Sequence, residues 1–530
     1  MSFQRRLTEL RLPINHDEAA LRAAICAGFG VSPADLLDYT VLRRAWDARR
    51  KSDITLVYTI DAVLAVSVQT GEPTPDLDYQ FVARAHRPPA KRPVVIGTGP
   101  CGIFAALILA QMGFAPLILE RGKVVRQRTK DTWGLWRRGE LNPESNVQFG
   151  EGGAGTFSDG KLYSQIKDPR HLGRKVLTEF VEAGAPEEIL YVAKPHIGTF
   201  RLVTMVESMR AKIEALGGEY RFETKVTDLD VEAGQVRAVV LESGERIETE
   251  HVVLAIGHSS RDTFAFLHRC GVYMEAKPFS IGVRIEHPQS MIDRHRFGPL
   301  AGHPILGAAD YKLVHHAGNG RSVYSFCMCP GGTVVAATSE PGRVVTNGMS
   351  QYSRNERNAN AGIVVGIFPA DYPGDVLAGV EFQRRWESAA FQAGGGTYAA
   401  PGQLVGDFLA GRPSKQFGEV LPSYRPGVTL TDISTCLPDY AIAAIREALP
   451  AFETQIKGFS RVDAVLTGVE SRTSAPLRIT RGKDFCSLNT RGLYPAGEGA
   501  GYAGGILSAG VDGIKVAEAV GLSLAGIEGR

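Results

Sequence analysis

The sequence lacks any apolar run that approaches the ~20 residues needed to cross a bilayer. Its opening, MSFQRRLTEL, also lacks the apolar core of a signal peptide. Neither sign of charge is in excess, since 59 Lys and Arg residues stand against 57 Asp and Glu residues, a net charge of +2 at pH 7. Such a balance gives no field for nucleic acid or an anionic lipid surface. These absences predict a cytoplasmic protein without a membrane span and without a nucleic-acid partner.

Cysteine is scarce as well. Seven cysteines, an odd number in a chain of 530 residues, do not make a disulfide framework. Cys327 and Cys329 stand two residues apart in SVYSFCMCPGG, which has the pattern of a strand running into a glycine turn. In a regular strand such residues lie about 6.6 Å apart, at the far limit for a disulfide. We therefore expect both to remain thiols rather than form a redox pair.

With 44% hydrophobic and 22% charged residues, a chain of this length is expected to hold about two to four domains. The first, residues 1–85, has the pattern of a small α+β module. Its expected elements are a strand over 7–14, a helix over 17–26, a second helical stretch over 33–50 and one or two strands over 54–68. The basic segment RRAWDARRK suits a solvated helix end, where cations complement the dipole, and the alternative is docking onto an anionic ligand or partner. Prolines and charges mark residues 83–93 as a linker.

Residues 93–122, PVVIGTGPCGIFAALILAQMGFAPLILERG, have the pattern of a complete nucleotide-binding unit. They predict a buried strand over 94–96, a G-x-G-x-x-G turn, an apolar helix over 103–112 and a second strand over 117–120. Gly97 permits the tight turn, Gly99 lets the backbone approach a pyrophosphate, and Gly102 lets helix and strand pack closely. The N-terminus of the helix offers free N–H groups to the anion.

Glu120 ends the second strand, where a carboxylate accepts hydrogen bonds from a ribose 2′-OH and disfavours a 2′-phosphate. The strand, the helix and this carboxylate together make the glycine turn a specific sign of a dinucleotide. The alternative is a strand-to-helix turn without a ligand. These residues leave the choice between NAD and FAD open.

The middle of the chain adds three features. A second glycine cluster, residues 149–164, suggests backbone lying against a ligand, with a flexible surface loop as the alternative. KPHIGTFRL places His196 in a short turn ahead of a predicted helix over 202–216. From residue 219 the period changes to two, which predicts a β-meander closing on an apolar strand over 252–256 that ends in Gly257.

Residues from about 265 to 460 carry no nucleotide signature and have the pattern of an inserted domain. SIGVRIEH alternates between apolar and polar residues, which predicts a strand. EFQRRWESAAFQAGGG has the pattern of a helix ended by glycine. PDYAIAAIREALPAFETQI predicts two helical segments, the second starting at Pro450.

The C-terminal stretch, residues 492–520, returns to the strand, glycine turn and helix pattern, with its helix starting at about Ser508. In a flavoprotein such a segment holds the ribityl chain and directs a helix N-terminus at the O2 and N1 edge of the flavin, where the dipole stabilises the reduced ring. An NAD domain does not need it. Two such segments at distant points of the chain therefore favour FAD.

The sequence resembles the bacterial FAD-dependent dehydrogenases among the glutathione-reductase-like (two-dinucleotide-binding-type) flavoproteins. The resemblance covers most of the chain and depends on VVIGTGPCGIFAAL with LERG, GEGGAGTFSDGKL, KPHIGT, SFCMCPGG, VESRTSAPLRI and PAGEGAGYAGGILSAGVDGI, among others. Three residues depart from the family pattern, namely Glu498 in place of Asp, Ile256 in place of Thr, and Phe200 in place of a polar residue.

By this resemblance the first glycines and Glu120 bind the ADP part of FAD, the 150–161 loop lies along the flavin, and Gly497 and Glu498 meet the ribityl and pyrophosphate region. The full set of implied FAD contacts is Gly97, Gly99, Pro100, Cys101, Gly102, Glu120, Arg121, Gly153, Gly155, Thr156, Ser158, Gly160, Lys161, Val226, Gly257, Gly497, Glu498, Gly505 and Ile506.

The resulting interpretation is an α/β protein with a Rossmann-like FAD-binding domain split in sequence. A small N-terminal α+β module precedes it, and an α+β substrate domain is inserted in it. The expected domains are residues 1–85 (module), 86–270 and 461–530 (FAD binding) and 271–460 (substrate domain). The expected reaction is hydride transfer between an unidentified small organic substrate and flavin N5, with His196, Glu470 and Arg472 as catalytic candidates. The alternative for Glu470 and Arg472 is a structural pair with each other.

Alternative functions are a flavin monooxygenase, a folate- and FAD-dependent RNA-modifying enzyme, which the charge balance disfavours, and a non-catalytic or redox-sensing flavoprotein. Only one G-x-G-x-x-G turn has its own strand, helix and acidic or basic ribose reader. NAD(P)H is therefore expected, if used at all, to bind transiently as an electron donor. The substrate and the oligomeric state stay open.

Overall fold

The computed structural model describes residues 2–527. In it, the N-terminal module is an antiparallel sheet in the order β2-β3-β1-β4, covered by one helix. Its elements are β1 (Phe3–Pro13), α1 (Glu18–Phe29), β2 (Leu36–Asp47), β3 (Thr55–Leu64) and β4 (Glu72–Pro73). Asp17 caps α1 by accepting a hydrogen bond from the Ala20 N–H at 2.8 Å. The predicted strand and helix at the start of the chain are confirmed.

The helical prediction for residues 33–50 is wrong, because most of this stretch forms β2. This strand pairs with β3 from Leu36 to Asp47, so its β-branched and aromatic side chains pack against a neighbouring strand. The basic segment RRAWDARRK therefore lies at a strand end. There the Asp47 carboxylate, rather than a helix dipole, pairs with Arg11 at 2.9 Å and Arg49 at 2.5 Å.

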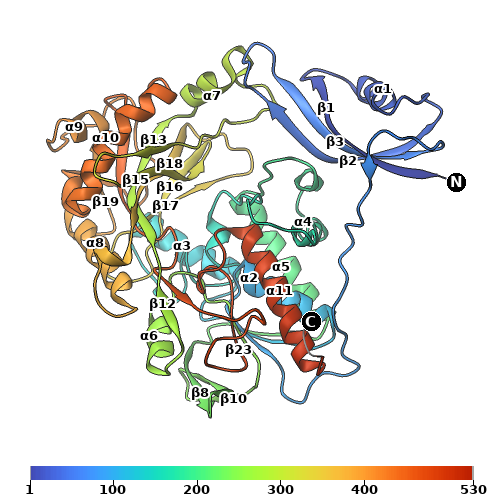
Figure 1. Ribbon diagram of the computed structural model, residues 1–530. Helices are drawn as coiled ribbons and strands as arrows, with labels where there is room; N and C mark the ends of the chain where they lie inside the picture. The colour runs from blue at the N-terminus through green and yellow to red at the C-terminus, as the bar shows by residue number, and fades with distance from the viewer. Residues whose placement is uncertain (1, 528–530) are drawn as a thin grey trace.

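Residues 74–93 contain neither helix nor strand and connect the module to the rest of the protein, as the long connection in Figure 1 shows. The module also contacts the body directly. The Arg44 N–H donates to the Tyr191 carbonyl at 2.6 Å, and the ring of Trp46 meets that of Phe297 edge to face at 5.3 Å.

A five-stranded parallel sheet, in the order β23-β11-β5-β6-β7, forms the centre of the first large body. We call it the nucleotide-binding body because it contains the predicted nucleotide-binding unit. Its strands are β5 (Val94–Ile96), β6 (Leu117–Leu119), β7 (Glu219–Arg221), β11 (Val252–Leu254) and β23 (Leu493–Pro495). Four of them are continuous apolar runs, as expected for a parallel sheet that is covered on both faces. β23, from the C-terminal part of the chain, lies beside β11, so the two ends of the sequence build one sheet.

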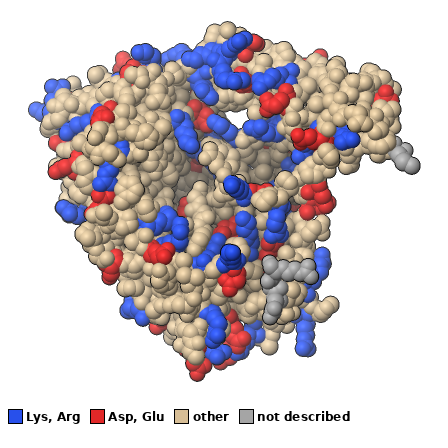
Figure 2. Space-filling view, viewed as in Figure 1, with Lys and Arg blue, Asp and Glu red and all other residues tan. Residues whose placement is uncertain are grey.

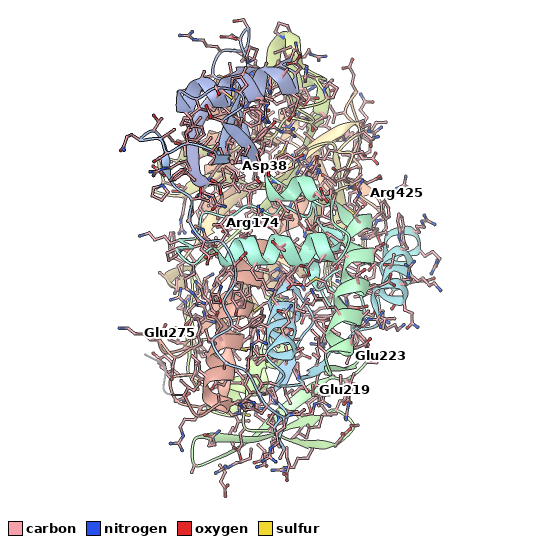
Figure 3. The ribbon with its side chains drawn as sticks, turned by 90° about the vertical axis from the view of Figure 1, so that its right-hand side faces the viewer. Asp38, Arg174, Glu219, Glu223, Glu275 and Arg425 are labelled. Atoms are coloured by element: carbon pink, nitrogen blue, oxygen red, sulfur yellow. The ribbon has the colours of Figure 1, made fainter. Side chains whose placement is uncertain are left out.

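The helices of this body are α2 (Pro100–Gln111), α3 (Val125–Arg138), α4 (Leu172–Glu182), α5 (Thr199–Ala215), α6 (Arg261–Arg269) and α11 (Ile506–Leu524). α2 and α11 run side by side, as Figure 3 shows, and share one buried apolar cluster. Gly513 permits this close approach, since a Cβ there would lie 2.2 Å from the Cys101 carbonyl oxygen.

The predicted β-meander is only partly right. β8 (Val226–Glu232), β9 (Gln235–Leu241) and β10 (Arg246–Glu248) form a separate three-stranded antiparallel sheet. The strands before and after them, β7 and β11, belong to the parallel sheet instead. Sequence alternation identified the strands but could not assign their partners.

A seven-stranded sheet, in the order β14-β15-β18-β13-β21-β19-β20, forms the second large body. Its strands are β13 (Phe279–Pro288), β14 (Val314–His316), β15 (Ser322–Cys329), β18 (Asn358–Ile367), β19 (Ala400–Leu404), β20 (Val428–Leu430) and β21 (Val465–Glu470). The other elements here are α7 (Gln289–Phe297), α8 (Ala378–Ala393), α9 (Val405–Leu409), α10 (Asp439–Gln455) and the pair β16 (Gly332–Ala336) with β17 (Thr346–Ser350). A further pair, β12 (Met274–Ala276) with β22 (Leu477–Ile479), packs in the hydrophobic cluster of the parallel sheet instead.

The boundary expected at residue 460 lies too early. β21 pairs with β13 and β19 in the large sheet, so the chain returns to the nucleotide-binding body only after residue 470.

Pro450 does not start a second helix, as the sequence pattern suggested, but lies inside the single helix α10. Buried side chains before it, such as Ile445 and Leu449, and after it, such as Phe452, belong to one hydrophobic cluster. Proline costs a helix interior about 3 kcal/mol. Continuous burial on both sides offsets that cost.

Cys327 interrupts β15. The pairing of β15 with β18 shifts register between Phe326 and Cys329, and Cys327 has a left-handed φ of 42°. This is a β-bulge, so the spacing of a regular strand does not apply to Cys327 and Cys329.

Among residues 2–527, no helix combines the length and the apolar character that a bilayer span requires. Basic and acidic side chains are interspersed over the face that Figure 2 shows, as the near-equal counts of the two charges suggest.

Candidate functional site

A cavity of about 400 Å³ lies between the parallel sheet and the seven-stranded sheet. Residues 96–101 and 119–121 line it from the carboxyl ends of β5 and β6. From the C-terminal segment it is lined by Ala496, Glu498, Gly504, Gly505, Ile506 and Ala509. Residues 326–327 and 345–347 line it from the other body. In an open α/β sheet, ligands bind outside the carboxyl ends of the strands, so the cavity is in the expected place.

The glycine turn after β5 has the geometry that the sequence predicted. A Cβ on Gly102 would lie 1.9 Å from the Gly97 carbonyl oxygen, so only glycine allows this contact of helix and strand. Gly99 precedes α2 and offers no side-chain cap, which leaves the first N–H groups of the helix free for an anion. A Cβ on Gly99 would meet the Cα of Gly153 at 3.7 Å, across the opening of the cavity.

Glu120 lines the cavity, and its carboxylate already accepts four hydrogen bonds from the protein. Oε2 accepts from the N–H of Thr98 at 3.0 Å and from its hydroxyl at 2.5 Å, while Oε1 accepts from the N–H groups of Gly122 at 2.9 Å and Gly150 at 3.0 Å. Glu120 therefore ties the first glycine turn to the second glycine cluster. Its contact with a ribose stays a prediction.

Buried Arg128 shapes the loop that follows. It donates to the carbonyl oxygens of Asn146 at 2.8 Å, Val147 at 2.7 Å and Glu151 at 2.7 Å. A buried charged group is tolerated only when its N–H donors find hydrogen-bond acceptors. The loop carbonyls are these acceptors, so their bonds to Arg128 hold the loop in one conformation. The loop then continues along the cavity as residues 153–163.

The C-terminal segment is fixed by a buried ion pair. Arg481 pairs with Asp512 at 2.5 Å, and Asp512 accepts a hydrogen bond from the Gly497 N–H at 2.7 Å. This places Glu498 in the cavity wall, ahead of the N-terminus of α11, which Gly505 begins without a side-chain cap. Burial raises the pKa of Glu498 to about 7.

The pKa of Glu498 leads to a prediction about stability. Because burial disfavours the charged form, ionising the Glu498 carboxyl lowers the stability of the folded protein. This loss begins as pH rises above the ordinary pKa of 4.5 and is complete above about pH 7. We expect Glu498→Gln to stabilise flavin-free protein at pH 8 by about 1 to 3 kcal/mol and to have little effect at pH 4.5. Urea unfolding at the two pH values measures the difference. An equal effect of the substitution at both pH values would contradict burial of the Glu498 charge as the cause.

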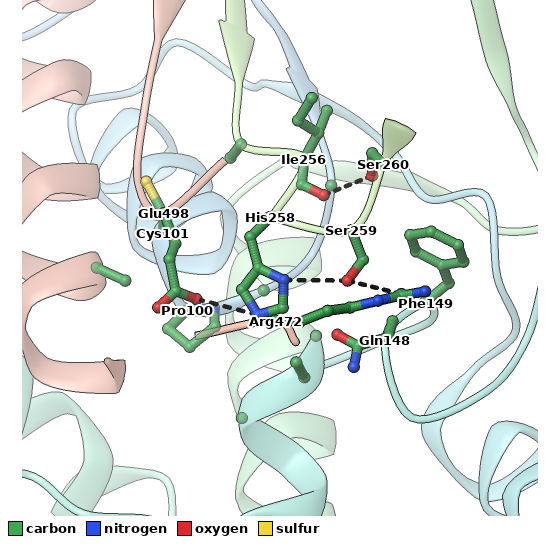
Figure 4. A pocket seen from close by; sticks show the side chains of 18 of the residues that line it. Pro100, Cys101, Gln148, Phe149, Ile256, His258, Ser259, Ser260, Arg472 and Glu498 are labelled. Carbon is green, nitrogen blue, oxygen red and sulfur yellow. Dashed lines mark hydrogen bonds and ion pairs between the residues drawn. The ribbon is translucent and has the colours of Figure 1, made fainter. Parts of the chain in front are cut away.

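His258 is a site residue that the sequence analysis missed. It follows Gly257 at the carboxyl end of β11 and lines the cavity. Figure 4 shows its ring between Glu498, whose Oε2 lies 3.9 Å from Nε2, and Ser259, whose hydroxyl lies 3.0 Å from Nδ1. Burial, then the charges of Arg472 and Arg261, lower the pKa of His258 to about 3. A polar run directly after an apolar strand is the signal that could have identified it.

The three catalytic candidates do not form one group. Glu470 and Arg472 line the cavity, whereas His196 is not among the lining residues. His196 stacks on the Tyr352 ring at 5.3 Å, and its Nε2 meets the Tyr352 carbonyl at 2.9 Å. A catalytic role for His196 stays a prediction.

Glu470 and Arg472, considered in the sequence as a pair with each other, take different partners. Glu470 pairs with buried Arg284 at 2.8 Å, and Arg472 with buried Glu387 at 3.2 Å. Glu470 is the last residue of β21 and Arg472 lies just beyond its end, so the two side chains join this strand to different elements.

Most of the predicted FAD contacts meet at the cavity. Those that line it are Gly97, Gly99, Pro100, Cys101, Glu120, Arg121, Gly153, Gly155, Ser158, Gly160, Lys161, Val226, Gly257, Glu498, Gly505 and Ile506. Gly102, Thr156 and Gly497 do not line it. Gly102 and Gly497 instead allow close packing, since a Cβ on Gly497 would lie 2.8 Å from that of Cys101.

Two families match parts of the chain. Residues 278–473 match the family described as "FAD-dependent protein, C-terminal domain-like", and residues 4–63 match a "Domain of unknown function (DUF8436)". The first match covers the seven-stranded sheet from β13 to β21, in agreement with the boundary that the sheet itself indicates.

Among whole proteins, an uncharacterized protein of Clostridium beijerinckii is 47% identical over 523 residues, which are 97% of this chain and 98% of that protein. Rubredoxin-NAD(+) reductase of Ectopseudomonas oleovorans is 30% identical over 110 residues, 17% of this chain and 29% of that protein. A flavoprotein/dehydrogenase structure from Cytophaga hutchinsonii has a TM-score of 0.38 and 11% identity, over 83% of this chain and 80% of that one.

Proposed function

The chain belongs to the same protein family as the Clostridium beijerinckii protein, and we propose that it is an FAD-dependent oxidoreductase that transfers a hydride between a small organic substrate and flavin N5. The observation that carries the proposal is that both glycine-rich segments, near Gly99 and near Gly505, line one cavity. The matched FAD-dependent C-terminal region supports it by supplying the other wall.

The residues present fit FAD. The free N–H groups at the start of α2 suit the pyrophosphate, and the carboxylate of Glu120 stands where the adenosine ribose is expected. The loop at 153–161 would lie along the isoalloxazine, and the N-terminus of α11 would face its O2 and N1 edge. Bound FAD supplies the two-electron chemistry, while the protein supplies orientation, charge and exclusion of water.

The seven-stranded body would bind the substrate. Phe326 and Asn347 line the cavity from this side, and Glu470 adds a carboxyl group. Burial raises the pKa of Glu470 although Arg284 opposes this effect. Glu470 is therefore the residue we assign to hold or accept a substrate proton, and Arg472 the residue that orients an anionic group.

We predict that the protein purifies yellow with one FAD per chain and that NADH and NADPH reduce the flavin only slowly. Only one G-x-G-x-x-G turn of the chain has its own strand, helix and acidic ribose reader, so a dedicated nicotinamide site of the usual kind is not expected. Absorption spectroscopy, followed by anaerobic stopped-flow mixing with each nucleotide, measures both properties.

A colourless protein that cannot be reconstituted with FAD would refute the proposed function. Fast reduction that saturates at low concentration of one nucleotide would instead reveal a second nucleotide site. Rapid oxygen consumption with NAD(P)H would favour the monooxygenase, and no turnover with any donor would favour the non-catalytic flavoprotein.

A further inference from the structure

Cys327 and Cys329 lie at the cavity in an arrangement that a regular strand cannot produce. The β-bulge at Cys327 turns this residue into the cavity wall, while Cys329 is fully buried behind it. The Cys329 thiol donates a hydrogen bond to the Cys327 carbonyl oxygen at 3.3 Å. Both are thiols in the structure. The reason for expecting them to stay unpaired, the spacing of about 6.6 Å in a regular strand, no longer applies.

Space for the buried thiol comes from a glycine on a neighbouring strand. A Cβ on Gly348 in β17 would lie 2.9 Å from the Cys329 sulfur, closer than real side chains approach. Gly332 is similar, with a Cβ position 3.3 Å from that of Cys329. The buried cysteine therefore occupies space that two glycines leave open.

Two cations surround the pair. The Lys161 ammonium contacts the Met328 carbonyl, between the two cysteines, and the Arg284 guanidinium donates to the Cys327 carbonyl at 2.9 Å. The neighbouring Cys329 thiol, and then the charges of Lys161 and Arg284, hold the pKa of the Cys327 thiol well below its ordinary value. A low-pKa thiol that lines a cavity, with a second thiol two residues away, is the arrangement of a reactive cysteine and its resolving partner.

We propose that Cys327 and Cys329 are a redox-active pair that exchanges two electrons with FAD bound in the same cavity. This inference rests on the proposed function, since it takes reduced FAD as the reductant. The Cys327–Cys329 disulfide accepts an electron pair and two protons, its S–S bond breaks, and two thiols form as FAD returns to its oxidised state. In the reverse direction, the Cys327 thiolate gives up the electrons. The disulfide can thus hold two further electrons, the number that one substrate oxidation releases.

A structural role is the competing explanation, because buried cysteines often serve as small apolar residues. That role explains Cys329 alone. It does not explain why a non-glycine residue at the cavity has a left-handed φ, a backbone conformation that is typically found at functional sites. Nor does it explain the cations beside a thiol.

The first test counts thiols in the purified protein. Samples equilibrated in a series of glutathione or dithiothreitol redox buffers are alkylated, digested and weighed by mass spectrometry. We expect the peptide that carries Cys327 and Cys329 to change between a doubly alkylated form and an unalkylated form lighter by two hydrogens than the free dithiol. The partly buried Cys270 and Cys486 are internal controls and should stay alkylated throughout. Full alkylation of Cys327 and Cys329 under oxidising buffers would overturn the proposal.

The second test measures how many electrons the oxidised holoenzyme accepts. Anaerobic dithionite titration of the wild type should consume twice the reductant that the flavin absorbance alone accounts for, while Cys329→Ser should consume only the flavin equivalents. Identical stoichiometry in both proteins would refute electron exchange. The two tests separate the hypotheses. A protein without FAD can still show the disulfide by mass spectrometry, and a yellow protein without the disulfide leaves the proposed function intact.

Discussion

Gly99→Val is expected to give a folded protein that contains no FAD and is therefore colourless. Gly99 begins α2 at the place where the pyrophosphate must approach the free N–H groups of the helix. Its Cβ position faces the Cα of Gly153 at 3.7 Å, so a single methyl group fits but the branched side chain of valine extends into the space between the two segments. Flavin content per chain, from the absorption spectrum after denaturation, measures the effect.

Gly99→Ala and Gly318→Val are the matched controls. Gly318 is exposed, and a Cβ there meets only the Glu447 carboxylate at 3.6 Å, so valine should leave flavin content unchanged. Gly99→Ala should reduce flavin content only in part. Normal flavin in Gly99→Val would show that this turn does not bind the pyrophosphate.

Glu387→Gln is expected to cause the largest loss of stability, about 3 to 5 kcal/mol. Glu387 in α8 is fully buried and joins Arg261 of α6 at 2.6 Å to Arg472 at 3.2 Å, so it connects the two large bodies. Without its charge, two buried guanidinium groups lose their shared partner. A fall in the urea midpoint and the melting temperature measures the change.

Glu381→Gln is the matched control, because Glu381 lies in the same helix and pairs with Arg384 at 2.6 Å but is 67% exposed. An exposed pair is worth about 0 to 1 kcal/mol, so this variant should melt close to the wild type. Equal losses in both variants would mean that the buried network contributes no more than a surface ion pair.

The Glu387 variant should also respond differently to acid. Although burial opposes it, the arginines hold the pKa of Glu387 well below its ordinary range. A carboxylate with a lowered pKa contributes stability that is present above its unfolded value and is lost as pH falls. The stability difference between wild type and Glu387→Gln should therefore narrow on acidification.

The nucleotide-binding elements could be predicted because their signals are local. The turn at Gly97, Gly99 and Gly102 needs glycine for contacts within a few residues, and the apolar run over 94–96 is confirmed as the buried strand β5. The wrong helix prediction for residues 33–50 has a long-range cause. Their basic and aromatic pattern is compatible with a helix, and only pairing with β3 made them a strand.

By itself, the sequence determined the short-range features: the glycine turns, the apolar strands and the carboxylate at the end of β6. Each follows from the steric or hydrogen-bonding needs of neighbouring residues, which a linear pattern records. Only the tertiary structure decided that Glu470 pairs with Arg284 and not with Arg472, that His258 lies at the cavity and His196 outside its lining, and that a bulge brings Cys327 and Cys329 into contact. These depend on which strands become neighbours, and sheet order is set by packing between distant segments rather than by any local propensity.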